Sequence, residues 1–170
     1  DGVLADDHSE RVYREAEGIE EYFEHEDQNS RVALAPGLLQ PLLADLNRIQ
    51  TLEEERRIGD PSYLPRLRIS LITARNAPAH ERPVHSMSEW GVNVNDAFFL
   101  GGIDKSKVLK VLRPHIFFDD QQVHLDGAVE YIAGVHIPYG VANIAKSVAN
   151  TDVAFPPHGA LEPELADVAG

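Results

Sequence analysis

Two adjacent carboxylates, Asp119 and Asp120, directly follow the apolar residues 116–118. Ile and Phe favour buried strands, so the pattern predicts a strand that ends in paired negative charge. Hard carboxylate oxygens suit Mg²⁺, an ion that keeps several of its water ligands in proteins. Taken alone, such a pair is also a common cap at the start of a helix. The pair is therefore a candidate metal site, and the assignment needs other functional residues at neighbouring strand ends.

Thr73 and Lys105 are the other candidate functional residues. Thr73 ends the strand pattern LRISLIT, and Lys105 follows the short strand AFFL and its GG turn. A hydroxyl and an ammonium group can both hold phosphate oxygens. Either residue alone has an ordinary explanation, as a turn residue or as a solvated lysine. Because open α/β sheets bind ligands beyond the carboxyl ends of their strands, the ordered set predicts a site for a phosphate and a metal ion.

The first part of the chain is expected to be helical. Asp7 and Glu10 resemble a capping box before a helix over about 9–25. A second helix is predicted over 36–50, where leucines form one broad face. The charged, turn-rich residues 51–62 are expected to separate these helices from the first strand.

The rest of the chain alternates strands with helices, which predicts a parallel α/β sheet. The expected strands are residues 67–73, 97–100, 115–118 and 133–140, and the expected helices are residues 78–90, a segment from about 104, and 121–131. The Pro-rich tail, residues 151–170, is predicted to be poorly ordered.

Composition excludes several classes of function. The 170 residues carry 15 Lys and Arg against 28 Asp and Glu, a formal charge of −13, which argues against nucleic acid or an anionic membrane as a partner. The absence of cysteine excludes disulfides and thiolate chemistry. No stretch is apolar enough to span a bilayer and no signal peptide precedes Asp1, so a cytoplasmic location is expected. The eight histidines lack a close ligand pair and are expected to be structural or surface residues.

Longer sequence motifs in the chain resemble those of a known protein family. DGVLADD, LITAR, GGIDK and IFFDD match, in order, the motifs of the haloacid dehalogenase-like (HAD) phosphohydrolases. LITARNAPAHERPV, WGVNVNDAFFLGG, RPHIFFDDQ and GVHIPYG resemble the cytosolic type I 5′-nucleotidase family over most of residues 1–140. The resemblance implies a Rossmann-like core with a parallel sheet, formed by residues 1–9 and 62–150, and a small helical cap inserted between the first two motifs, at residues 10–61.

The resemblance also implies Mg²⁺-dependent hydrolysis of nucleoside 5′-monophosphates through an aspartyl-phosphate. Asp1 aligns with the aspartate that protonates the leaving 5′-oxygen and later activates water. Thr73 would bind a phosphoryl oxygen and Lys105 would neutralise developing charge. Asp120 would ligate Mg²⁺, with Asp119 in support.

Four further residues are candidates for substrate contact. Arg75 and Asn76 lie just past Thr73, and Tyr22 and Phe23 lie within the expected cap. An aromatic ring could stack on a nucleobase there, with Tyr22 the residue to test and core packing favoured for Phe23.

The family's nucleophile should lie two residues before Asp1, after an apolar strand at the centre of the sheet. We therefore expect upstream residues that are absent from this sequence. The alternative, Asp1 as the nucleophile, would place Val3 where the acid/base belongs. Two other functions stay open, a catalytically silent nucleotide-binding protein and a phosphatase for other small phosphomonoesters. The sequence does not identify the preferred base or the preferred sugar. It also leaves the oligomeric state open, with a homo-oligomer as one option.

Overall fold

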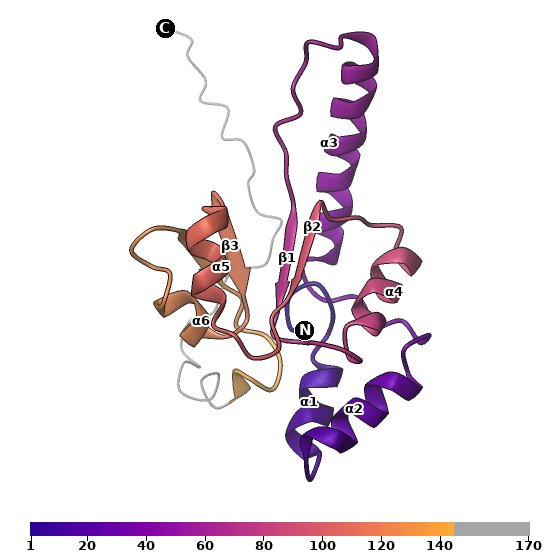
Figure 1. Cartoon of the computed structure of the whole chain (residues 1–170), viewed down its shortest axis with the longest axis vertical. Coiled ribbons are helices and arrows are strands. Elements are labelled where there is room, and N and C mark those ends of the chain that lie inside the picture. Colours follow the sequence, from indigo (N-terminus) through magenta and orange to yellow (C-terminus); the bar gives the residue numbers. More distant parts are fainter. Residues whose placement is uncertain (145–170) are drawn as a thin grey trace, which may run out of the picture.

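The computed structural model describes residues 1–144, so the predicted disordered tail, residues 151–170, lies outside the described residues. The described chain contains short strands and helices in alternation after three N-terminal helices (Figure 1). In order they are α1 (His8–Glu15), α2 (Ile19–Gln28), α3 (Gln40–Gly59), β1 (Ser70–Thr73), α4 (Glu81–Glu89), β2 (Asp96–Phe99), α5 (Lys105–Leu112), β3 (Ile116–Asp119), α6 (Gln122–Asp126) and β4 (Ala133–His136).

The strands form two parallel pairs. β1 pairs with β2 from Ser70 opposite Asp96 to Thr73 opposite Phe99, and β3 pairs with β4 from Ile116 opposite Ala133. The predicted parallel α/β arrangement is thus confirmed for each pair. Within the described residues, β1 and β3 each have one strand neighbour, so the two pairs do not join into one sheet.

Alternation along β1 places its side chains in two separate cores. Leu71 packs against the cluster of Leu43, Met87 and Val92, which belongs to α3, α4 and the loop after α4. Its neighbour Ile72 packs against the second cluster, Leu109, Ala128 and Ile132, on the side of α5 and α6. Because successive strand residues point to opposite faces, a four-residue strand is enough to be covered on both.

The N-terminal helical region differs from the sequence prediction in two respects. The single helix expected over 9–25 is interrupted: Ala16 is extended at ψ 139° and Gly18 is also extended, so α1 and α2 are separate helices. The capping box is wrong as well, because the Asp7 carboxylate makes no cap hydrogen bond. It accepts hydrogen bonds from Arg11 Nη2 and from the backbone N–H of Val141 instead.

Helix α3 is longer than predicted and α6 is shorter. The charged residues 51–59 continue α3, which starts with Pro41 in its first turn and ends at Gly59. Glu and Arg are strong helix formers, and Arg57 pairs with Glu54 one turn away, so charge there indicates a solvated helix and not a turn. Helix α6 stops at Asp126, five residues before the predicted end.

A backbone strap joins the N-terminal loop to the segment before α3. Gly37 N–H donates to Leu4 O at 2.7 Å, Asp6 N–H donates to Ala35 O at 2.9 Å, and Ala5 bridges Pro36 in antiparallel fashion. A Cβ on Gly37 would lie 2.4 Å from the carbonyl oxygen of Ala5. The strap therefore requires glycine at position 37.

We predict that Gly37→Ala lowers the free energy of unfolding by roughly 1–3 kcal/mol, because backbone atoms would have to move apart. Urea unfolding of the intact protein measures this. Gly59→Ala is the matched control, since a Cβ on Gly59 meets nothing within 4 Å, and its expected effect is about 0.5 kcal/mol or less. Equal effects of the two substitutions would show that the strap does not constrain Gly37.

Candidate active site

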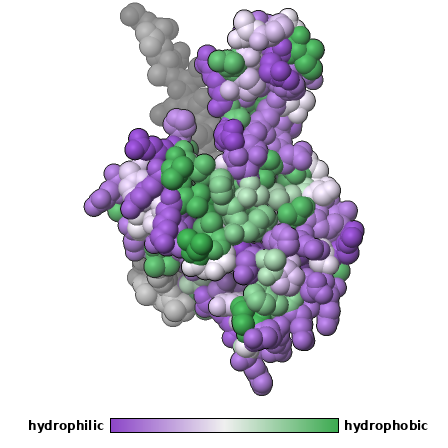
Figure 2. All heavy atoms as spheres, viewed as in Figure 1, coloured by the Kyte–Doolittle hydropathy of each residue, from purple (hydrophilic) through white to green (hydrophobic). Residues whose placement is uncertain are grey.

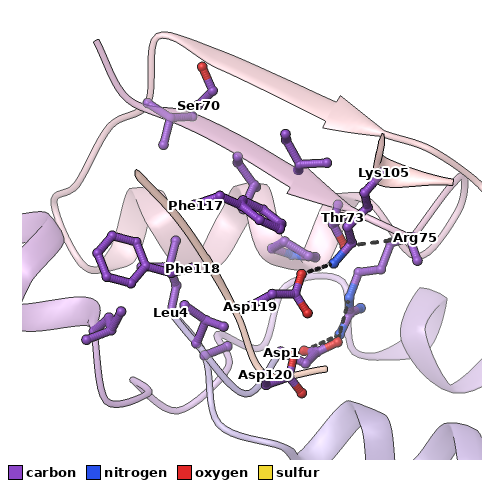
Figure 3. A pocket seen from close by; sticks show the side chains of 18 of the residues that line it. Asp1, Leu4, Ser70, Thr73, Arg75, Lys105, Phe117, Phe118, Asp119 and Asp120 are labelled. Carbon is purple, nitrogen blue, oxygen red and sulfur yellow. Dashed lines mark hydrogen bonds and ion pairs between the residues drawn. The ribbon is translucent and has the colours of Figure 1, made fainter. Parts of the chain in front are cut away.

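The predicted chemical groups gather at one edge of the strands. Thr73 ends β1, Asp119 ends β3, and Lys105 begins α5 after β2, so all three lie near the carboxyl ends of strands (Figure 3). With Asp1 and Asp120 they line one cavity of about 1110 Å³. The structure thus brings these residues to one cavity, while their roles stay a prediction.

Lys105 and Asp119 form a buried ion pair. Lys105 Nζ donates to Asp119 Oδ2 at 2.6 Å, while Oδ1 accepts from the Gln121 backbone N–H and contacts His124 Nδ1, each at 2.9 Å. Burial alone would raise the pKa of the Asp119 carboxyl, but His124, Lys105 and the Gln121 N–H together hold it below its ordinary value. Asp119 is thus an ionised residue whose oxygens already have partners.

The position of Lys105 follows from its local sequence. Gly101 and Gly102 both adopt positive φ, which lets the chain turn sharply after β2. Asp104 then caps α5, its carboxylate accepting from Ser106 N–H at 2.8 Å. The turn and the cap place Lys105 at the first position of α5, facing the end of β3.

Asp120 lies in a different environment from its neighbour. Within residues 1–144, no side chain donates a hydrogen bond to its carboxylate, and burial raises its pKa, with the charge of Asp119 adding to the rise. Its backbone is held firmly, because its carbonyl oxygen accepts from Asn143 Nδ2 at 2.8 Å and contacts His136 Nε2 at 3.0 Å. The amino group of Asp1 and Lys105 act in the opposite direction and lower the pKa of Asp120 from nearby. The Asp120 carboxylate is therefore held in position without a side-chain hydrogen-bond donor among residues 1–144.

The carboxylates of Asp119 and Asp120 are oxygen donors of the kind that Mg²⁺ binds. No group of three His, Cys, Asp or Glu residues that could hold a metal ion occurs in the part of the chain that the structure describes. A three-ligand zinc site is thus not formed there. Mg²⁺ is commonly held by one or two carboxylates with waters and phosphate oxygens, a requirement that Asp120 can meet with Asp119 beside it.

Arg75 lies deep in the site and is held by other protein groups. Its Nη2 donates to both oxygens of Asp1, at 2.8 and 2.9 Å, and its Nε donates to Oδ2 at 3.2 Å. Its Nη1 donates to Glu26 and to the Ala79 carbonyl oxygen. The guanidinium is directed at Asp1 (Figure 3) and also donates to Glu26, whereas its predicted contact with substrate stays a prediction.

Glu26 is a site residue that the sequence did not indicate. It is fully buried on α2 and accepts hydrogen bonds from Arg75, from Arg82 Nη1 at 3.0 Å and from Ser9 Oγ at 3.0 Å. Burial would raise its pKa, but the two guanidiniums lower it below the ordinary value. No spacing pattern relates Glu26 to partners 49 and 56 residues away, which is why sequence reasoning missed it.

The remaining candidates lie around this cavity. Thr73 is half-buried, and its hydroxyl accepts from the Arg75 N–H at 3.3 Å. Asn76 is exposed, with its side chain over Gly101. Tyr22 is buried and Phe23 only half-buried, so Tyr22 is the more enclosed ring of the two, and burial raises the pKa of Tyr22 to about 12. A contact with a nucleobase stays a prediction for both rings.

Comparison with known proteins identifies a family and a related human protein. The family model for 5′-nucleotidase matches residues 1–144. Human cytosolic 5′-nucleotidase 1B is 36% identical over 129 residues, which is 75% of this chain and 20% of that protein. The chain thus spans about a fifth of the length of this relative. No solved structure matches, and none of the described helices is long and apolar enough to cross a membrane.

We predict that Glu26→Gln lowers the free energy of unfolding by roughly 3–5 kcal/mol at neutral pH, because it leaves two buried guanidiniums without their carboxylate. A carboxyl with a lowered folded-state pKa stabilises the protein above its unfolded value of about 4.3, and this stabilisation is lost as the pH falls through the folded value. The difference between wild type and variant should therefore shrink at acid pH.

Urea unfolding of both proteins between pH 7 and pH 3 measures this difference. Glu24→Gln, an exposed position on the same helix, removes the same charge and is expected to match wild type at every pH. A wild-type advantage over Glu26→Gln that does not change with pH would contradict the assignment.

Proposed function

This chain belongs to the 5′-nucleotidase family, and we propose that it contributes the active site of an enzyme that hydrolyses nucleoside 5′-monophosphates to nucleoside and phosphate. The observation that carries the proposal is the assembly of Thr73, Lys105 and Asp120 with Asp1 around one cavity. It places a hydroxyl, an ammonium group and two carboxylates at one strand edge, the set that phosphoryl transfer requires. In keeping with the name of the human relative, we propose a cytosolic location.

Each residue has a defined role in this proposal. The Thr73 hydroxyl donates a hydrogen bond to a phosphoryl oxygen, and Lys105 neutralises the negative charge that develops there. Asp1 protonates the leaving 5′-oxygen and later accepts a proton from the attacking water. Asp120, with Asp119 in support, would hold Mg²⁺, whose positive charge would stabilise the phosphoryl group.

We propose that the nucleophilic aspartate is carried by a β-strand that lies in the cavity and leads into Asp1. The cavity is lined along the whole of β1 and β3, including Ile72 and Phe117, and Asp1 lies at its polar end. Among the residues that the structure describes, β1 and β3 each have a strand neighbour on one side only. A parallel strand between them would pair both edges and would bring an aspartate two residues before Asp1 next to Lys105.

Residues 10–61 are proposed to supply the lid that selects the nucleoside. Tyr13, Tyr22 and Phe23 of α1 and α2 line the cavity with Asp1, which supports a role in enclosing the substrate. Helix α3 also lines the cavity, through Leu42, Leu43 and Leu46. Only the helix pair α1 and α2 supplies Glu26, the residue that bonds to Arg75 beside Asp1.

The strand proposal predicts slow amide hydrogen exchange along both β1 and β3 in a protein that includes the proposed strand before Asp1. An inserted strand would bond the edge groups that face the cavity, and bonded amides exchange slowly. Exchange measured by mass spectrometry or NMR should show protection of residues 70–73 and 116–119 on both edges. If half of the amides in each strand exchanged as fast as those of an exposed edge, the proposal would be wrong.

The functional proposal predicts phosphate release from nucleoside 5′-monophosphates that requires Mg²⁺. Asp120→Asn should reduce kcat by about 100-fold or more, and Asp119→Asn should reduce it less, because Asp119 is occupied by Lys105 and His124. Asp27→Asn, at an exposed position on α2, is the control. Activity that survives a chelator unchanged would contradict the magnesium assignment.

A substrate panel separates the alternatives. Release from small phosphomonoesters but not from nucleotides would indicate a phosphatase of different specificity. Nucleotide binding without release would indicate a silent nucleotide-binding protein.

A further inference from the structure

The polar groups around Arg75 form a closed cluster of four charges. Asp1 and Glu26 supply two carboxylates, and Arg75 and Arg82 supply two guanidiniums, so the formal charges cancel. The side chains of Arg75 and Glu26 are 5% and 0% exposed, whereas that of Asp1 is 17% exposed and borders the cavity. The cluster thus has a closed end at Glu26 and an accessible end at Asp1.

We propose that Arg75 is a positioning residue for catalysis: it fixes the orientation of the Asp1 carboxylate, and Glu26 holds Arg75 in place from the side of α2. The inference rests on the proposed function, in which Asp1 transfers protons. It assigns to Arg75 a role through Asp1, in place of the direct substrate contact that its position after Thr73 suggested.

The contacts between the Arg75 guanidinium and the Asp1 carboxylate, which we call the fork, support this role. Three N–H···O contacts of 2.8 to 3.2 Å join Arg75 to Asp1, and they use Nε and Nη2, the donors on one side of the planar guanidinium. Such paired contacts fix the direction of a carboxylate as well as its position. A lysine would keep the positive charge but has a single nitrogen, which cannot serve Asp1 and Glu26 with the same geometry.

The other side of the guanidinium is fixed by the fold. Nη1 donates to Glu26 and to the carbonyl oxygen of Ala79, a residue that is 1% exposed. Glu26 in turn is held by Ser9 of α1 and Arg82 of α4. Because three helices converge on this carboxylate, the orientation of Asp1 depends on how α1 and α2 sit against the strands.

Arg82 provides a matched comparison. It donates to Glu26, and to the carbonyl oxygen of Val32, but it makes no contact with Asp1. Arg82→Lys therefore disturbs the same buried cluster without altering the fork on Asp1. A purely structural role would make Arg75→Lys and Arg82→Lys equivalent in activity.

The test is a double-mutant cycle on the intact protein, with kcat and KM measured for phosphate release from a nucleoside 5′-monophosphate. The proteins are wild type, Arg75→Lys, Asp1→Asn and the double variant, with Arg82→Lys as control and urea unfolding to confirm that each is folded. Arg75→Lys should lower kcat by about 10- to 100-fold in the wild-type background and by less than about threefold with Asp1→Asn. Arg82→Lys should lower kcat by clearly less than Arg75→Lys does, because it leaves the contacts between Arg75 and Asp1 in place.

Two results would overturn the role of Arg75. Equal reductions by Arg75→Lys in both backgrounds would mean that Arg75 does not act through Asp1, and a raised KM in both would identify a substrate contact. If Arg75→Lys does not fold, Glu26→Asp takes its place in the cycle with Asp1→Asn. Additive effects of Glu26→Asp and Asp1→Asn on kcat would then also contradict the proposal. A wild-type protein that releases no phosphate would instead overturn the proposed function, and this inference with it.

Discussion

The buried ion pair between Arg75 and Glu26 is the interaction on which the arrangement of the site depends. It links α2 to Arg75, the second residue after β1, and through the contacts between Arg75 and Asp1 it reaches the N-terminal loop. Ion pairs of this kind are costly to bury, and one partner without the other would be strongly destabilising. Here the cost is offset by a neutral group of four charges, in which Glu26 accepts hydrogen bonds from Ser9, Arg75 and Arg82 and contacts His25 Nδ1 at 3.2 Å. The helices α1 and α2 are thereby fixed to the reactive edge.

The adjacent residues Asp119 and Asp120 show how environment assigns different roles to identical side chains. Asp119 is surrounded by donors, and its pKa is lowered, whereas Asp120 lacks side-chain donors within the described residues, and its pKa is raised. The difference follows from strand geometry, because neighbouring residues at a strand end point in opposite directions. One carboxylate serves Lys105, and the other is left facing Asp1 and Gly2, where a cation would be stabilised.

Much of the site could be predicted from sequence because its signals are local. A strand pattern that ends in Thr73, the GG turn before Lys105 and the apolar run before Asp119 each depend on a few consecutive residues, and the structure places all three together. The break between α1 and α2 was missed because the apolar periodicity continues across residues that adopt extended backbone. The partners of Glu26 were missed because they come from distant segments. An apolar surface is visible in the centre of the molecule in Figure 2.

The central claim is that Asp1, Thr73, Lys105 and Asp120 surround one phosphoryl group and one cation. A crystal structure of the intact protein with Mn²⁺ in place of Mg²⁺ and with a phosphate analogue tests it most directly, since anomalous scattering locates the ion. The account predicts Mn²⁺ on the Asp120 carboxylate and analogue oxygens within hydrogen-bond distance of Thr73 Oγ1 and Lys105 Nζ. An ion or an analogue bound away from these residues would contradict it.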